Sequence, residues 1–335
     1  MILIDGSQAG GQLVRTACAL SAITKKPFKI TNIRGARPNP GLQTQHIEGV
    51  KSIAELCNAK TKGLALNSKE LEFFPNQLEA KDLKIKISTA GSIGLILQAL
   101  LIVTSQLKKS IKIEIDGGGT LNKWAPPVLY LEKVLFPLIG EESRINVLKD
   151  GFYPKGGARV GIITKPLKLK PIEILEKGDI TEINGFSIAS KSLEKAKVAE
   201  RQTKTAKELI KQKFNRELNI ETKYVDSLSP GSGVLIYIKT ENSVIGGDSL
   251  GEIKKSAEDV AKEAVKNLIF EYANGSVGRH AADMLLIYMA LAKSGKIKTS
   301  EITHHIRTNI TVIEKFLPVK FEINEKDKII SVTQL

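Results

Sequence analysis

The pattern of hydrophobic and polar positions repeats three times along the chain. Three segments each begin with an apolar helix of about three turns, continue through a lysine-rich turn, and enter a strand of alternating residues. These segments are residues 15–35, 94–118 and 280–302. Lysine suits the C-terminal end of a helix because its charge opposes the helix dipole there. A second helical pattern follows each segment, at residues 42–59, 126–140 and 311–318.

Strand patterns close each of these units, which predicts an α+β protein. We expect three repeated βαβαββ units that pack one layer of helices against sheets in a large domain. The third unit is interrupted, because its opening strand is predicted at 158–170 and its first helix near residue 277. The residues between them predict a smaller βαββα insert domain. The predicted boundaries are 1–179 and 275–335 for the large domain and 180–274 for the insert.

Length and charge narrow the class of protein. A chain of 335 residues exceeds one ordinary domain. Its net charge of +14 and pI near 9.5 favour a phosphate-rich partner, with a lysine-rich surface kept for solubility as the alternative. No apolar run is long enough to span a membrane, and the N-terminus does not resemble a secretory signal. Cys18 and Cys57 lie in apolar helical patterns and are expected to be buried thiols. We therefore expect a cytoplasmic protein that contacts no membrane.

Glycine-rich turns precede several of the predicted helices. The stretch GGQLVRTA places two glycines before a helix and Arg15 one turn into it, and IRGARPNPGLQTQH carries Arg34 and Arg37 on a stiff loop. Backbone amides at a helix start and fixed guanidinium groups both suit phosphate. The alternatives are a tight strand–helix turn and solvated surface arginines. Neither a Walker A nor a GxGxxG pattern is present, so the ordinary nucleotide-binding folds are not indicated.

Three further side chains have two interpretations each. Gln98 lies on an apolar helix and needs a polar partner. Asp116 is either a metal ligand or, as usual for aspartate before glycine, a turn residue. Trp124 either stacks on a base or packs against the proline pair that follows it.

Two of the four histidines, His304 and His305, are adjacent. They precede a predicted helix that opens with a capping-box pattern, Thr311 with Glu314. No cysteine or acidic cluster has ligand spacing to them, so zinc is poorly supported. Neighbours in an extended segment point to opposite faces. One histidine is therefore expected to face inward, where it could serve as a nucleophile or an acid–base group. The alternative is that both are ordinary surface residues.

Taken together in order, these motifs resemble the RNA 3'-terminal phosphate cyclase family over essentially the whole chain. The matching stretches are DGSQAGGQLVRTA, IRGARPNPGLQTQH, TAGSIGLILQ, GFYPKGGARV, GSGVLIYIKTE, GGDSLGE, HAADMLLIYMALA and HHIRTNITVIEKFLPV. The resemblance implies three βαβαββ repeats with an insert in the third. It also implies ATP-dependent conversion of an RNA 3'-phosphate to a 2',3'-cyclic phosphate, through a histidine–AMP and an RNA–adenylate intermediate, with a divalent ion, Mg²⁺ or Mn²⁺.

The resemblance also assigns residues. His305 matches the nucleophile of the family pattern His-x-x-Thr-Asn, and His304 stands at a variable position. By the same match, the phosphate pocket comprises Arg15, Arg34, Arg37, Gln45 and Gln98. His280 and Asp283 fall where the family contacts adenosine, although His280 replaces a frequent tyrosine. Gln8 stands at or beside the place of a family glutamate near the metal, in a shortened loop, which predicts weaker metal binding there.

Two other classes of protein share parts of this pattern. A catalytically inactive relative acting as a ribosome-biogenesis scaffold has the same fold but lacks the histidine. An enolpyruvyl transferase has similar units, but six of them in two domains. The RNA substrate and the oligomeric state do not follow from the sequence.

Overall fold

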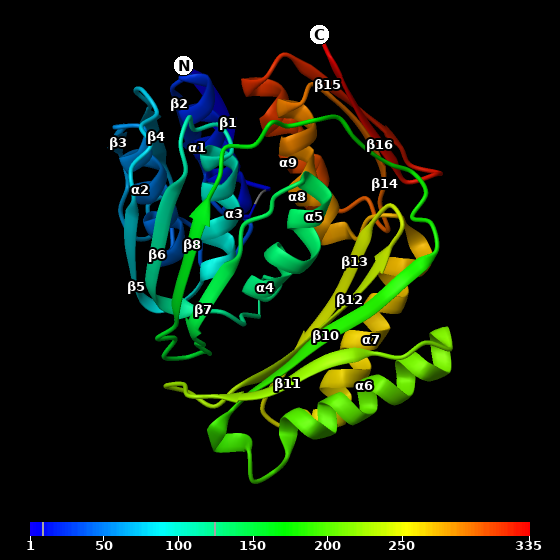
Figure 1. Ribbon diagram of the computed structural model, residues 1–335. Helices are drawn as coiled ribbons and strands as arrows, with labels where there is room; N and C mark the ends of the chain where they lie inside the picture. The colour runs from blue at the N-terminus through cyan, green and yellow to red at the C-terminus, as the bar shows by residue number, and fades with distance from the viewer. Residues whose placement is uncertain (9, 124) are drawn as a thin grey trace.

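The computed structural model describes residues 1–8, 10–123 and 125–335. It is an α+β protein with four sheets of four strands each (Figure 1). Trp124, singled out by the sequence, lies outside the described residues. Within those residues, no helix combines the length and hydropathy needed to cross a membrane.

Three of the sheets and their helices account for most of the chain. The first has helices α1 (Gln12–Thr24) and α2 (Thr44–Leu56) with strands β1 (Ile2–Asp5), β2 (Phe28–Thr31), β3 (Lys60–Lys62) and β4 (Leu71–Phe74). The second has helices α3 (Ile93–Thr104), α4 (Val128–Tyr130) and α5 (Phe136–Ile139), with a π-helical turn, η1 (Leu131–Leu135), between the last two, and strands β5 (Leu83–Ser92), β6 (Ile111–Gly119), β7 (Ile145–Lys149) and β8 (Arg159–Thr164). The third has helices α8 (Arg279–Leu291) and α9 (His304–Phe316) with strands β9 (Ile172–Ile174), β14 (Ser294–Lys298), β15 (Val319–Asn324) and β16 (Ile329–Gln334).

These three sheets share one topology. Their strand orders are β1-β2-β4-β3, β5-β6-β8-β7 and β9-β14-β16-β15. In each sheet the first two strands pair in parallel and the remaining neighbours pair antiparallel. The segment 158–170 therefore does not open the third sheet as predicted. It contributes β8 to the second sheet, and the third sheet opens with β9.

The fourth sheet lies between Ile180 and Asn274 and occupies the lower part of the molecule in Figure 1. Its elements are β10 (Ile180–Ser190), a 3₁₀ turn η2 (Lys191–Leu193), α6 (Val198–Phe214), β11 (Asn219–Val225), β12 (Ser232–Thr240), β13 (Val244–Leu250) and α7 (Ala257–Asn274). This is one strand more than the predicted βαββα pattern, because β13 was not expected. Its sequence, VIGGDSL, has two central glycines, which weaken a strand signal.

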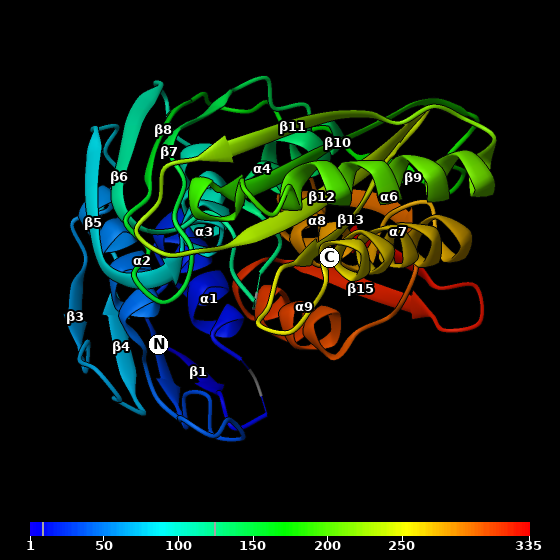
Figure 2. The same ribbon diagram turned by 90° about the horizontal axis from the view of Figure 1, so that it is seen from below.

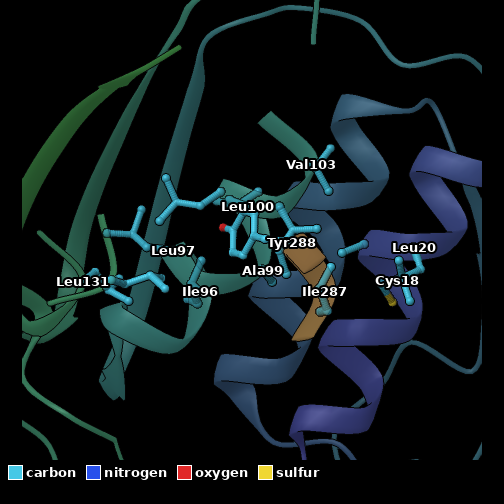
Figure 3. Close-up of a cluster of buried hydrophobic side chains, with 14 of the residues drawn as sticks. Cys18, Leu20, Ile96, Leu97, Ala99, Leu100, Val103, Leu131, Ile287 and Tyr288 are labelled. Atoms are coloured by element: carbon cyan, nitrogen blue, oxygen red, sulfur yellow. The ribbon is translucent and has the colours of Figure 1, made fainter. Parts of the chain in front are cut away.

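The main hydrophobic core lies between the helices and the first three sheets. Figure 3 shows part of it, where Leu100 of α3 lies beside Tyr288 of α8, and Cys18 lies beside Leu20 on α1. Cys18 is buried there, and Cys57 is buried as well; both are free thiols, as expected. Burial raises the pKa of each thiol. Their role is therefore packing.

A second, smaller core lies between the fourth sheet and helices α6 and α7. The opposite face of the same sheet packs against the main core through Leu235, Tyr237 and Val244. Seen from below, the fourth sheet and its helices lie across the helices of the main core (Figure 2). The sheet is thus covered on both faces, which explains the almost unbroken burial along β12.

The last helix begins earlier than predicted. It starts at His304, and the side chain of Thr303 accepts a hydrogen bond from the backbone N–H of Ile306, so Thr303 is the N-cap. The predicted cap, Thr311, is inside the helix, and its hydroxyl donates to the carbonyl of Arg307 at 3.1 Å. The expectation that His304 and His305 lie in an extended segment is therefore wrong. They form the first turn of α9.

Candidate active site

Three helices begin close to one glycine turn. The side chain of Gln12, the first residue of α1, donates to the carbonyl of His305 in the first turn of α9 at 3.1 Å. The buried ring of His46, in the first turn of α2, lies directly against Gly11. Each helix start carries a partial positive charge and open N–H groups. Their meeting at Gly10 and Gly11 therefore favours an anion at this point.

A network of buried polar groups connects α1, α8 and α9. Oδ1 of Asp283 accepts a hydrogen bond from Gln12 Nε2 at 2.9 Å and another from Asn309 Nδ2 at 2.7 Å. Asn309 Oδ1 in turn accepts from the hydroxyl of Thr16 at 2.8 Å. Arg15, Gln98 and these four residues line one small cavity of about 30 Å³. Residues about 300 positions apart in the sequence thus hold helices α1, α8 and α9 together.

This network explains the His-x-x-Thr-Asn pattern. Asn309 is buried in the network, while the hydroxyl of Thr308 donates to the carbonyls of His304 and His305. The first turn of α9 is therefore held on both sides. The side chain of His305 remains exposed. Among the described residues its ring has no hydrogen-bond partner, so its position is fixed by its own backbone.

The imidazole of His305 is kept neutral. Its pKa is lowered, first because protein surrounds much of the ring and then because Arg37, Arg15 and His304 lie nearby. A positively charged ring would be repelled by these groups. At neutral pH the ring therefore offers an unprotonated nitrogen, which a nucleophile requires.

His304 has a contact that the sequence did not indicate. Its Nε2 lies 2.8 Å from the carbonyl oxygen of Gln8. The ring therefore connects α9 to the loop before α1, and His304 is not an isolated surface residue. The side chain of Gln8 itself is exposed.

Arg15 and Asp283 form the charged part of the buried site. Burial lowers the pKa of Arg15 to about 10, and Asp283 opposes this shift. Burial raises the pKa of Asp283 to about 6, and this shift is opposed by Asn309, Arg15 and Gln12. Arg15 thus stays charged at neutral pH, and the pKa of Asp283, at about 6, lies just below neutral pH.

The two loop arginines differ in their surroundings. Nη1 of Arg34 donates to the carbonyls of Asn39 at 2.6 Å and Gly41 at 2.9 Å, so Arg34 braces its own loop. Arg37 is exposed, and its Nη2 lies beside Gly10. Its charge acts on His305, as the pKa of that ring shows. Arg37 is therefore the better placed of the two for an anion at the glycine turn.

The remaining predicted residues lie around this centre. His280, at the start of α8, packs edge-on against Tyr130 at 6.4 Å between ring centroids. Its pKa is lowered to about 4 by the surrounding protein and by Arg279 and His305, although part of its surface stays exposed. Gln45 lies further from the centre, because its Oε1 accepts from the backbone N–H of Ser92 at 3.0 Å and supports the start of α3.

Sequence reasoning did not assign roles to Gln12, Thr16, Asn309 and His46. A buried glutamine directly after a glycine pair and an asparagine inside an apolar helix were usable signals. The contact of His46 with Gly11 had no such signal, because it depends on how α2 packs on α1.

The described residues contain no group of three or more histidine, cysteine or acidic side chains arranged to hold a metal ion. The expected divalent ion is therefore not matched by a protein ligand set in this part of the chain, and we derive no chemical step from it.

A neutral, exposed histidine beside converging helix starts and arginines is an arrangement typical of enzymes that act on phosphate groups. A sequence model of the family described as RNA 3'-terminal phosphate cyclase matches residues 7–323. The RNA 3'-terminal phosphate cyclase of Thermococcus gammatolerans is 43% identical over 327 residues, covering 96% of this chain and 93% of the relative. That of Pyrococcus abyssi is 42% identical over 331 residues, covering 97% of this chain and 95% of the relative. That of Pyrobaculum aerophilum is 43% identical over 335 residues, covering 97% and 95%.

The chain therefore belongs to the RNA 3'-terminal phosphate cyclase family, a family of enzymes. The match over nearly the whole chain places it there and not among the enolpyruvyl transferases. The resemblance seen in the motifs is confirmed.

A first prediction concerns the space at Gly11. A Cβ added there would lie 1.9 Å from Nε2 of His46, whose Nδ1 is already held by the backbone N–H of Gln43 at 3.0 Å. We expect Gly11→Ala to lower the free energy of unfolding by about 1–3 kcal/mol, because the ring cannot move aside.

Gly49→Ala is the matched control, since nothing lies within 4 Å of its added Cβ inside α2. It should raise the free energy of unfolding by roughly 0.5–1 kcal/mol. Chemical denaturation measures both variants. Equal effects of the two substitutions would contradict the packing argument.

A second prediction concerns pH. Because the pKa of Asp283 is raised to about 6 in the folded state, the folded state binds more protons than the unfolded state between about pH 4 and 6. This group's contribution to stability is therefore lost as pH rises through that range. Asp283→Asn retains an acceptor for Gln12 and Asn309 but has no charge. We expect it to be more stable than the wild type at pH 7.5, by roughly 1–3 kcal/mol, and nearly equal at pH 4.

The measurement is the difference in unfolding free energy between the two proteins across this range. A difference that does not change with pH would show that Asp283 is not the titrating group.

Proposed function

We propose that this chain is an active RNA 3'-terminal phosphate cyclase that uses ATP and His305 to convert an RNA 3'-phosphate to a 2',3'-cyclic phosphate. The observation that carries the proposal is the geometry of His305. Its ring is exposed and kept neutral, while its backbone is fixed at the meeting point of three helix starts.

In the first step, a ring nitrogen of His305 attacks the α-phosphorus of ATP. A P–N bond forms, the P–O bond to the β-phosphate breaks, and pyrophosphate leaves. The helix starts and the guanidinium groups of Arg15 and Arg37 stabilise the negative charge that builds on the phosphate oxygens.

In the second step, an oxygen of the RNA 3'-phosphate attacks the phosphorus of the histidine–AMP. The P–N bond breaks, the ring of His305 leaves neutral, and an RNA–adenylate anhydride forms. In the third step, the 2'-oxygen attacks the 3'-phosphorus and loses its proton. The anhydride P–O bond then breaks, AMP leaves, and the cyclic ester remains.

The proposed site residues divide into two groups around His305. Arg15, Arg37 and Gln98 surround the phosphates, and Arg34 and Gln45 shape the loop and the helix start beside them. His280 and Asp283, both on α8, are proposed to contact the adenosine, and Asp283 lines the same small cavity as Arg15 and Gln98. Asp283 also holds Gln12 and Asn309, so its role is partly structural.

We infer that a divalent ion, Mg²⁺ or Mn²⁺, enters with the nucleotide and is held mainly by its phosphates. The support is the lack of a ligand cluster in the described residues and the neutral side chain at Gln8. Hard cations prefer carboxylates, which this loop does not supply.

We also infer that the first three sheets, with their helices, are three copies of one βαβαββ unit, and that residues 180–274 form an insert domain. The shared strand order supports the repeats, and the separate core around α6 and α7 supports the insert. The insert is not independent of the large domain, because Leu235 and Tyr237 pack into the main core.

The alternative is an inactive, cyclase-like scaffold. It predicts no covalent labelling by ATP, whereas the proposed enzyme forms a stable histidine–AMP. The presence of His305 in a fixed and accessible position favours the enzyme.

A third prediction tests the nucleophile. His305→Ala should abolish labelling by ATP that carries radioactive phosphorus at the α position. His304→Ala should retain most labelling, because its ring is directed to the Gln8 carbonyl and is not required for the bond to phosphorus. Full labelling of the His305→Ala protein would exclude His305 as the nucleophile.

A fourth prediction separates the two loop arginines. Arg37→Ala should reduce cyclisation by about 10- to 100-fold, the loss of one charge-assisted contact, and leave thermal stability unchanged. Arg34→Ala should reduce cyclisation and also lower the melting temperature, because two backbone carbonyls lose their donor. Turnover with a 3'-phosphate RNA and thermal unfolding measure the two effects. Wild-type turnover in the Arg37→Ala protein would make that residue an ordinary surface arginine.

A further inference from the structure

A cleft of about 1200 Å³ opens between the second sheet's loops and the insert. One wall comes from residues 89–92, 121–123 and 152–154, and the other from residues 230–232 and 250–257. Pockets for small molecules usually measure about 300–1,000 Å³. This cleft is therefore of a size that suits a polymer segment better than a single small ligand.

The cleft and the candidate active site both border the first turn of α2. Gln45 lines it and supports the start of α3 through Ser92. The next residue, His46, turns the other way and lies against Gly11 at the proposed phosphate pocket. A strand whose terminal phosphate reaches the glycine turn can therefore extend past Gln45 into the cleft.

The lining is chemically suited to a single-stranded nucleic acid. Tyr153 stands on one wall with 78% of its surface exposed, and Ile253 on the other with 95% exposed. An exposed aromatic ring such as that of Tyr153 serves as a stacking platform for an unpaired base. The loop of Tyr153 is anchored by the buried ring of Phe152, which packs against Gly231 of the insert.

The positively charged side chain of Lys123 also lines the cleft. Lys123 reaches Glu252 across the cleft at 3.4 Å, and both side chains are more than half exposed. An exposed ion pair of this kind is weak. A backbone phosphate can therefore compete with Glu252 for Lys123.

We propose that this cleft binds the single-stranded nucleotides that precede the 3'-terminal phosphate, with Tyr153 stacked on a base and Lys123 facing the backbone. The proposal rests on the proposed function and assigns the insert a role as the second wall of the RNA channel.

The rival RNA path is the outer face of the second sheet. It carries Lys84, Lys86 and Lys112 in a shallow hollow of about 910 Å³. Among the described residues, the side chains that line this hollow include no aromatic ring and no residue of the candidate site. The cleft is favoured because it offers an exposed ring for stacking and is lined by Gln45, in the turn of α2 that borders the candidate site.

The test measures binding of 3'-phosphate oligonucleotides of increasing length without ATP, so that no chemistry occurs. For the wild type, a hexamer should bind more tightly than a dinucleotide. Tyr153→Ala should weaken hexamer binding by about 5- to 100-fold, with little change for the dinucleotide. Tyr153→Phe should retain the affinity, because its ring still stacks.

Leu148→Ala is the matched control, because Leu148 is 63% exposed but lies on the outer face of the second sheet. It should leave hexamer binding unchanged. Thermal unfolding of each variant confirms that it folds.

Two results would overturn the proposal. One is unchanged hexamer binding by Tyr153→Ala, and the other is a larger loss from a Lys84→Ala/Lys86→Ala variant than from Tyr153→Ala. Absence of ATP labelling in the wild type would contradict the proposed function alone, since the binding test does not use ATP.

Discussion

The buried hydrogen bonds of Asp283 are the interaction on which the rest of the site depends. They join Gln12 near the start of the chain to Asn309 near its end, and both of these side chains are buried. Removing one member leaves a buried group unsatisfied, which costs about 1–3 kcal/mol. The first turn of α9 is therefore held in one position, and His305 with it. A nucleophile that had to be ordered at each turnover would lose part of its advantage from orientation.

The same charges that attract phosphate also prepare the nucleophile. Burial lowers the pKa of His305 most, and Arg37 and Arg15 lower it further, so the ring that meets an incoming anion is already neutral. Both effects come from placing cations and helix starts around one point. A carboxylate beside His305 would raise its pKa and repel the nucleotide. The position of Asp283 agrees with this, because its Oδ1 is bound by two amide donors and its pKa is raised by burial.

Periodicity predicted the helices well and their exact ends less well. The apolar spacing located α1, α3 and α8, whose burial is decided by local pattern. The predicted start of α9 was too late, because Thr311 with Glu314 fits a local capping pattern. In the structure Thr303 is the N-cap, since its hydroxyl accepts from the backbone N–H of Ile306. The family motifs pointed to the site residues, but no local signal shows that Gln12 lies beside His305, since that contact depends on how the first and third sheets come together.

Glycines explain both a failure of prediction and the rigidity of the cleft. In β13, Gly246 and Gly247 weaken the strand pattern, yet an added Cβ would meet the ring of Tyr130 at 2.8 Å or the backbone of Leu268 at 2.3 Å. Gly247 faces α7 within the insert, whereas Gly246 faces Tyr130 of the large domain. The insert can therefore approach the main core at this point because Gly246 has no side chain. Gly231 makes the same kind of contact with Phe152, at 2.3 Å for an added Cβ. With close contacts at both ends, the insert has little room to move as a lid. The width of the cleft is set by packing, which suits a channel that holds a strand while its end reacts.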